Sequence, residues 1–155
     1  MRTNEITLKD GIDRVRPEDF PRVVEVWEES VRPTHLFLTE SDIQSIKPHV
    51  QAELEGLSGL ACIRDGQGSV VAFVGWKERK IEALFVHPSW HRAGIGKRLV
   101  DYAMSQGGAT LVDVNEENKQ ALAFYLHIGF TVESRSALDG MGMPFPLLHL
   151  KYKPT

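Results

Sequence analysis

The sequence lacks the features that mark several protein classes. Its single cysteine, Cys62, excludes a disulfide within the chain. No apolar run is long enough to cross a bilayer, and residues 1–11 lack the apolar centre of a secretory signal peptide. The formal net charge of −3 gives no basis for bulk binding to nucleic acid or to a membrane surface. We therefore expect a cytoplasmic protein that binds neither.

Internal repeats, low-complexity tracts and linkers are also missing, so the 155 residues are interpreted as one domain spanning 1–155. A chain of that length can bury a substantial core. Residues 1–11 are expected to be loosely ordered. We expect no metal site, and the sequence leaves open whether the protein is a monomer or a homodimer.

The pattern of predicted elements is typical of an α/β (α+β) fold with a mixed, mostly antiparallel sheet of six or seven strands and about four helices. The predicted strands cover residues 12–16, 60–63, 70–76, 81–86, 110–114, 130–134 and 147–152. The predicted helices cover residues 16–33, 39–55, 96–107 and 115–128. Pro33 is expected to end the first helix, and Asn115 to cap the last. A helical crossover leads into strand 110–114, which is therefore expected to run parallel to strand 81–86.

The stretch from Ile81 to Lys97 organises the chain. An apolar run rich in β-branched and aromatic residues ends at a proline, and Gly94 and Gly96 then open an amphipathic helix. Backbone N–H groups point outward at a glycine-led helix start, where the helix dipole is positive, so this junction can hold a phosphate group. Arg92 and Lys97 add positive charge. The plainer interpretation is a flexible loop before a core helix.

Two better-known phosphate motifs do not fit this stretch. A dinucleotide-binding fingerprint requires a third glycine, but Leu99 stands at that position. A P-loop requires serine or threonine after its glycine and lysine, and here Arg98 follows Lys97.

With these elements placed, the chain resembles the GNAT superfamily of acetyl-CoA-dependent N-acetyltransferases over its whole length. The segment 91–96 fits the family pattern Gln/Arg-x-x-Gly-x-Gly/Ala except at its first position, which is His91. The family's second signature is matched by Asn118, Ala121, Phe124, Tyr125, Gly129 and Phe130. The connector 34–38 and the ending 144–150 resemble small single-domain bacterial members, a group proposed to include protein lysine acetyltransferases.

The resemblance implies acetyl-CoA as co-substrate and no metal. It also implies that the central parallel strands, 84–86 and 111–114, splay apart at the cofactor site. Main-chain N–H groups of residues 91–97 would hold the CoA pyrophosphate, and strand 84–86 would run beside the pantetheine arm. The cofactor-binding residues implied are Leu84, Phe85, Val86, His91, Arg92, Ala93, Gly94, Ile95, Gly96, Lys97, Asn118 and Phe124. Because His91 replaces Gln or Arg, any side-chain charge needed there must come from Arg92.

Direct transfer requires that the protein align an amine, remove its proton and help the sulfur leave. Tyr125, which shares a helix face with Asn118, is the candidate general acid; an ordinary packing tyrosine is the alternative. Asn118 would hydrogen-bond the CoA arm or merely cap the helix. Glu82 is the candidate base, because burial in an apolar strand would raise its pKa; a solvent-facing carboxylate is the alternative. His35, titratable near neutrality, competes for that role, as does a water chain.

The expected acceptor is a primary amine, either a protein lysine or N-terminus or a small amine. Phe37 and the loop 136–146 would shape its pocket, while His149 is either structural or lines the same cleft. Two rival functions remain open at this stage. One is a non-catalytic domain that binds or senses acyl-CoA, and the other is a nucleotide-phosphate binder that uses Gly94 and Gly96.

Overall fold

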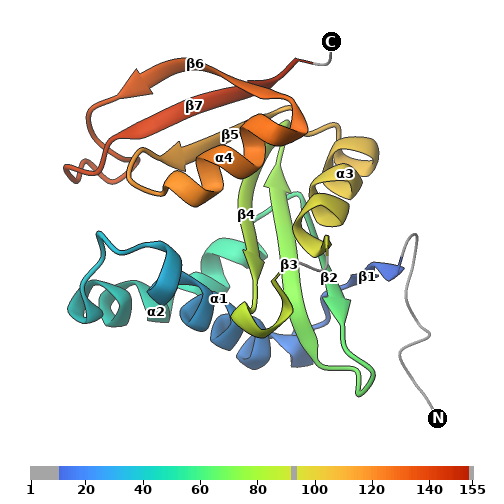
Figure 1. The fold of residues 1–155 in the computed structure, drawn as a ribbon. Coiled ribbons are helices and arrows are strands. Elements are labelled where there is room, and N and C mark those ends of the chain that lie inside the picture. Colours follow the sequence, from blue (N-terminus) through green and yellow to red (C-terminus); the bar gives the residue numbers. More distant parts are fainter. Residues whose placement is uncertain (1–10, 92–93, 154–155) are drawn as a thin grey trace.

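The computed structural model describes residues 11–91 and 94–153, and its centre is a seven-stranded sheet (Figure 1). The strands are β1 (Asp13–Arg14), β2 (Gly59–Arg64), β3 (Val70–Lys77), β4 (Lys80–Val86), β5 (Leu111–Asn115), β6 (Phe130–Ser136) and β7 (Leu147–Tyr152). The helices are α1 (Phe20–Thr34), α2 (Glu40–Glu55), α3 (Ile95–Gly107) and α4 (Lys119–Ile128), with short 3-10 turns η3 (Pro17–Asp19) and η4 (Pro88–Trp90). The strand order is β1-β2-β3-β4-β5-β7-β6, and of the described pairs β4–β5 alone is parallel. The predicted fold class is therefore confirmed.

Helices cover both faces of the sheet (Figure 1). On one face α1 packs against β3 and β4, and α2 packs against α1, around buried residues such as Val23 and Phe73. On the other face α3 packs against β2, β3 and β4, and α4 against β5 and β6, around Leu99 and Phe130. This arrangement brings the first turns of α3 and α4 to the end of β4. Within the described ranges, no helix has the length and apolar character needed to cross a membrane.

The parallel pair β4–β5 is short. Its register contains two pairs, Lys80↔Leu111 and Ile81↔Val112, after which the rest of β5 pairs with β7 alone. Of the remaining residues of β4, 83–86 pair with β3 but not with β5, and Glu82 is paired with neither strand. The two strands therefore separate toward their carboxyl ends, and a gap opens in the middle of the sheet.

Two predicted helix boundaries are wrong. α4 begins at Lys119, and its cap is Asn118, whose Oδ1 accepts a hydrogen bond from the N–H of Ala121 at 3.1 Å. Asn115 instead ends β5, because β7 continues to pair with β5 through that residue. α1 also runs through Pro33, since a proline in the last turn removes only one helix hydrogen bond.

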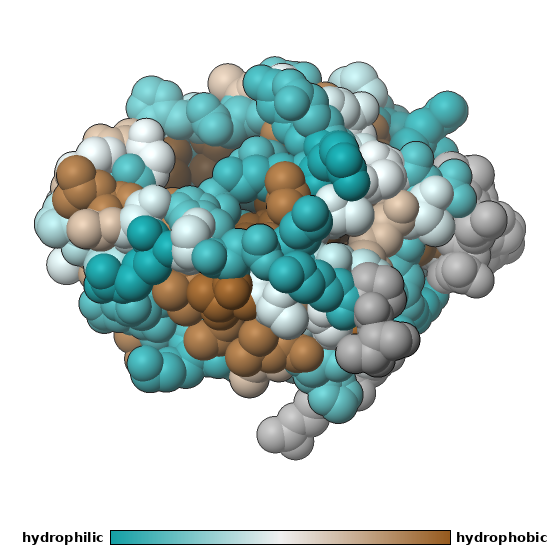
Figure 2. Space-filling model, turned by 90° about the horizontal axis from the view of Figure 1, so that it is seen from above, coloured by the Kyte–Doolittle hydropathy of each residue, from teal (hydrophilic) through white to brown (hydrophobic). Residues whose placement is uncertain are grey.

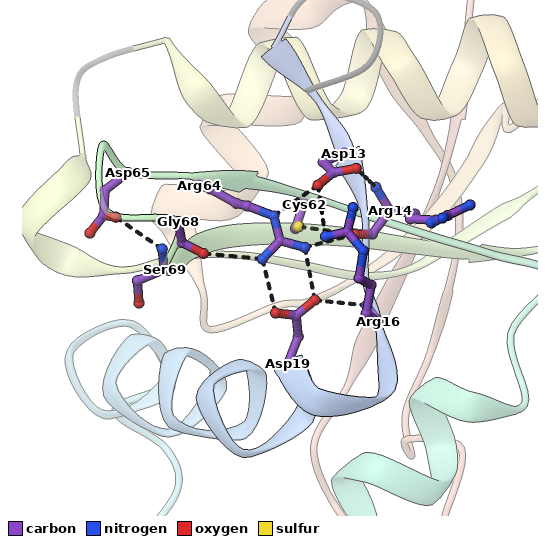
Figure 3. A network of polar contacts seen from close by, with 9 residues as sticks. All are labelled: Asp13, Arg14, Arg16, Asp19, Cys62, Arg64, Asp65, Gly68 and Ser69. Atoms are coloured by element: carbon purple, nitrogen blue, oxygen red, sulfur yellow. Dashed lines mark hydrogen bonds and ion pairs between the residues drawn. The ribbon is translucent and has the colours of Figure 1, made fainter. Parts of the chain in front are cut away.

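A buried ion-pair network fastens the start of the described chain to β2 (Figure 3). The Arg64 side chain, 7% exposed, binds both oxygens of Asp19 at 2.9 and 2.8 Å and Asp13 at 2.9 Å. Arg16 also pairs with Asp13, at 3.2 Å. The Arg64 guanidinium holds the pKa of Asp19 below its ordinary value. Burial raises the pKa of the neighbouring Cys62 to about 12, so this thiol stays protonated and is a poor nucleophile.

We expect Arg64→Met to lower the free energy of unfolding by about 3 kcal/mol, because buried Asp13 and partly buried Asp19 lose their principal cation. Urea unfolding followed by circular dichroism measures this loss. The matched control is Arg135→Met, which breaks an exposed pair with Glu116 and should cause no measurable change. If Arg64→Met lost no more free energy of unfolding than Arg135→Met, the network would not stabilise the fold.

Candidate active site

A cleft of about 470 Å³ opens where the end of β4 meets the first turns of α3 and α4. Ten of the predicted cofactor-binding residues line it, namely Leu84, Phe85, Val86, His91, Gly94, Ile95, Gly96, Lys97, Asn118 and Phe124. The other two, Arg92 and Ala93, lie outside the described residues. The fold thus brings together side chains that are far apart in the sequence.

Gly94 sets the geometry at the start of α3. Its φ of +71° lies in the left-handed region, which glycine adopts without steric cost. The first hydrogen bond of the helix runs from the N–H of Arg98 to the Gly94 carbonyl, at 3.2 Å. The N–H groups of Ile95, Gly96 and Lys97 precede that bond, at the positive end of the helix dipole and on a segment that lines the cleft. This arrangement suits an anionic group.

Two side chains at this helix start are engaged within the chain. Lys97 pairs with Asp101 at 2.9 Å, one turn further along α3. His91 lies with Nε2 3.1 Å from the carbonyl oxygen of Val86, and since a carbonyl only accepts, Nε2 donates. His91 stands where the family pattern has Gln or Arg. Its hydrogen bond therefore attaches the segment that follows β4 to the end of that strand. In the described part of this helix start, the main-chain N–H groups that precede the first helix hydrogen bond can donate to an anion.

A second cleft, of about 180 Å³, occupies the gap between β4 and β5. Glu82 and Asp113 line it from the two strands, and it shares His35, Asn118 and Tyr125 with the first cleft. The two clefts therefore meet at residues from the α1–α2 connector and the first turns of α4. The structure brings Glu82, His35 and Tyr125, the three predicted catalytic residues, to this one gap.

Tyr125 is buried, and its hydroxyl has no partner within the described ranges. Its side chain is 5% exposed, and its ring packs edge-on against Phe124 and Phe130 with centroids 5.0 and 5.3 Å away. Among the described residues the hydroxyl makes no hydrogen bond, although a buried polar group normally has one. Burial raises the pKa of Tyr125 above its ordinary value, so the phenol keeps its proton. The side chain thus offers a neutral O–H donor at a cleft wall.

Asn118 combines the two roles that the sequence left as alternatives. Its Oδ1 caps α4 through the N–H of Ala121. Its side chain is 7% exposed and lines both clefts, and in the described part of the chain its Nδ2 group has no acceptor. Capping therefore uses one end of the amide and leaves two N–H donors for a molecule in the cleft.

His35 is held in one tautomer. The Thr34 hydroxyl oxygen lies 2.6 Å from the carbonyl oxygen of Ser30 and 2.9 Å from Nδ1 of His35. The single hydroxyl proton goes to the carbonyl, so the hydroxyl can only accept from Nδ1, which therefore carries the ring proton. Nε2 keeps its lone pair. Burial lowers the pKa of His35 to about 4, so the ring is neutral near pH 7.

The prediction that Glu82 is a buried carboxylate is wrong. Its side chain is exposed, between buried Ile81 and Ala83. The register pairs Gly75 with Ala83 and Trp76 with Ile81, which leaves Glu82 as the extra residue of a β-bulge. Glu82 lines the second cleft and also a third cleft of about 350 Å³ at the end of α2. Glu82 is therefore an accessible negative charge at the gap.

Phe37 lies beside the second cleft without lining it. Its ring contacts His35, with centroids 5.4 Å apart, and Phe145 of the β6–β7 loop, at 5.3 Å. Phe37 therefore bridges the two loops that the sequence assigned to the acceptor pocket.

His149 reaches the second cleft only through Asp113. Its Nδ1 lies 2.7 Å from the Asp113 carboxylate and its Nε2 lies 2.6 Å from the Ser136 hydroxyl, while Asp113 also pairs with Lys80. Sequence reasoning missed Asp113, although the apolar residues on either side of it in β5 indicate that it faces away from the α3–α4 core. In the part of the chain that the structure describes, no group of three or more His, Cys, Asp or Glu side chains could hold a metal ion.

Comparison with known proteins identifies the class. A family model of the acetyltransferase (GNAT) domain matches residues 56–132. The peptidyl-lysine N-acetyltransferase YjaB of Salmonella typhimurium is 35% identical over 142 residues, which cover 92% of this chain and 97% of that relative. The chain therefore belongs to the GNAT family of acetyltransferases.

Solved structures agree with this assignment. The apo form of YjaB from Escherichia coli matches with a TM-score of 0.83 and 33% identity, covering 93% of this chain and 97% of that one. PaiA N-acetyltransferase from Thermoplasma acidophilum, solved in complex with coenzyme A, shares the fold with a TM-score of 0.68 and 21% identity, covering 91% and 98%. With the family established, this protein is an acetyl-CoA-dependent N-acetyltransferase.

Burial and the contact with Thr34 predict the pKa and the tautomer of His35. We expect the ring to stay neutral down to a midpoint near pH 4, with the proton on Nδ1, because burial disfavours the charged form. Nitrogen–proton NMR correlation spectra of the imidazole across a pH series measure both the midpoint and the tautomer. Thr34→Val removes the acceptor at Nδ1 and should admit the other tautomer, whereas Thr34→Ser keeps it. A midpoint near the ordinary histidine value of 6.5 would contradict the assignment.

Proposed function

We propose that this enzyme transfers the acetyl group of acetyl-CoA to the amine of a peptidyl lysine by direct attack, with no acetylated enzyme residue on the path. One observation carries the proposal: the unpartnered Tyr125 hydroxyl and the N–H groups that open α3 belong to the walls of one cleft. Two relatives that align over nearly their whole length are named peptidyl-lysine N-acetyltransferases, which supports a lysine acceptor.

The donors of the first cleft fit coenzyme A. The N–H groups of Ile95, Gly96 and Lys97 would hold its diphosphate, and Nδ2 of Asn118 would donate to an acceptor on the pantetheine arm. When bound, acetyl-CoA supplies an acetyl group already activated as a thioester. The fit rests on Nδ2 of Asn118, which belongs to a buried side chain and has no acceptor among the described residues, an arrangement that is costly unless a bound molecule supplies one.

Tyr125 would act as the general acid. Because burial raises its pKa, its hydroxyl holds a proton at physiological pH and can donate it toward the departing sulfur. The packing of its ring between Phe124 and Phe130 fixes the direction of the C–O bond. Little reorganisation is then needed at the moment of proton transfer.

The acceptor amine is protonated in solution and must lose a proton before it can attack the thioester. A lysine amine with a pKa of about 10.4 is neutral in only about one part in a thousand near pH 7.4, a penalty of roughly 4 kcal/mol. Glu82, exposed at the second cleft and without an ion-pair partner among the described residues, would attract the ammonium group and pass its proton to solvent. Nε2 of His35 would then accept a hydrogen bond from the neutral amine and orient it.

Tyr125→Phe is expected to lower kcat by about 10²-fold while the Kd for acetyl-CoA changes little, because the substitution removes a proton donor and keeps the ring. Release of free thiol with a lysine peptide measures kcat, and calorimetry measures Kd. The control is Tyr102→Phe, on α3 against Trp76 and outside both clefts. Unchanged kcat in Tyr125→Phe would remove the general-acid role. Coenzyme binding without turnover across a broad amine panel would instead indicate an acyl-CoA sensor.

Gly94→Glu is expected to abolish binding of acetyl-CoA, because it places a negative charge at the N–H groups that open α3. Gly108→Glu is a matched control. Gly108 stands at the other end of the same helix with a φ of +67°, and at both positions an added Cβ meets nothing within 4 Å. Backbone strain is therefore similar in the two variants. Calorimetry with acetyl-CoA should show binding in Gly108→Glu alone; unchanged affinity in Gly94→Glu would refute the placement of the diphosphate.

A further inference from the structure

Exposed apolar side chains lie on two loops that are joined by the contact between Phe37 and Phe145. Leu36, in the connector between α1 and α2, is 82% exposed, and in the β6–β7 loop Met141 is 84%, Leu138 51% and Met143 46% exposed. We call these four residues the apolar rim. Figure 1 shows the two loops one above the other on the same side of the molecule, and Figure 2 shows apolar groups at the surface at that end. Scattered exposed apolar residues are ordinary, but a group at one place marks an interaction surface.

The β6–β7 loop has a defined shape that leaves its methionines outside. The Asp139 carboxylate accepts hydrogen bonds from the N–H groups of Met141 and Met143, at 2.9 and 2.8 Å. The Asp139 N–H donates to the Met143 carbonyl at 2.9 Å, and Gly142 takes the φ of +78° at this turn. Met141 is therefore exposed in a hydrogen-bonded turn.

The apolar rim is connected to the catalytic gap through His35, Phe37 and Phe145. Leu36 lies between His35, which lines both clefts, and Phe37. The Phe37 ring contacts His35 on one side and Phe145 on the other, so it joins the connector to the β6–β7 loop. A molecule resting on the rim would therefore lie next to the point where the amine must enter.

The charge at the second cleft, between β4 and β5, indicates which kind of group binds there. Glu82, on β4, contributes an exposed acidic residue without an ion-pair partner among the described residues, whereas the Asp113 carboxylate, on β5, is paired with Lys80. A cation is favoured there, whereas the rim favours an apolar group. Together the two surfaces suit a molecule that carries an ammonium group and an apolar side chain a short distance apart.

We propose that the apolar rim binds an apolar side chain of a polypeptide acceptor, adjacent in sequence to the lysine that is acetylated. This inference rests on the proposed function and specifies its acceptor. Methionine side chains are flexible and polarisable, so the rim would select apolar character and not one residue type. A small polyamine carries no apolar side chain to cover the rim. A second copy of the chain seated there would obstruct the cleft that the acceptor must enter.

The test uses pairs of peptides that contain one lysine and differ only in whether leucine or asparagine stands next to it, before or after. We expect kcat/KM with acetyl-CoA to be roughly tenfold higher for leucine in at least one pair, as burial of one such side chain allows. The double variant Leu36→Gln, Met141→Gln should bring that ratio close to one. Both side chains are exposed, so folding should be unaffected, and thermal unfolding checks this.

Val132→Thr is the matched control, because Val132 is 46% exposed on β6 and does not belong to the rim; its ratio should equal that of the original protein. Equal rates for leucine and asparagine peptides, or a ratio that the double variant leaves unchanged, would overturn the inference while lysine acetylation still stands. Acetylation of small amines but of no peptide would also overturn it, as would a dimer in sedimentation that the double variant dissociates. Failure to acetylate any amine would instead refute the proposed function.

Discussion

The early end of the β4–β5 pairing is the constraint on which the site depends. An interior parallel pair in a sheet normally continues along both strands, because unpaired main-chain groups inside a protein are costly. Here the pairing stops after Lys80↔Leu111 and Ile81↔Val112. β5 continues on β7, β4 continues on β3, and the bulge at Glu82 adds local twist. The sheet thus stays continuous through its other pairs while a gap with polar walls opens at its centre.

Burial at that gap sets two protonation states through one physical effect. Removing a side chain from water disfavours its charged form, which raises the pKa of a phenol and lowers the pKa of an imidazole. Tyr125 therefore keeps a proton that it can donate, and His35 keeps a lone pair that can accept. Thr34 adds direction, since its contact with Nδ1 leaves Nε2 as the acceptor. A donor and an acceptor, both neutral, then belong to residues that line the gap between β4 and β5, where we propose that the amine meets the thioester.

Local patterns in the sequence were sufficient to predict much of this arrangement, and long-range pairing explains what they missed. The strand ending at Val86 and the helix opened by Gly94 follow from apolar periodicity and glycine, and both line the first cleft. Glu82 was expected to be buried because its neighbours are apolar, but a β-bulge depends on register with β3, which composition does not encode. Asp113 was missed for a similar reason: its contact with His149 arises only when β7 pairs with β5.

The two sides of the gap differ in structure. One is formed by main-chain groups at the start of α3, and the other by the α1–α2 connector and the β6–β7 loop. On the side where we propose that the coenzyme binds, the ligand is always the same, so main-chain N–H groups held by the packed core of α3 would serve it whatever the side chains. On the acceptor side the walls come from a connector and a loop joined through Phe37 and Phe145, with apolar side chains left in water. Substitutions in those segments disturb little of the core, so acceptor preference can change there without cost to the fold. Under the proposed function, acceptor selectivity would therefore depend on these two exposed segments, and the reaction on the gap in the sheet.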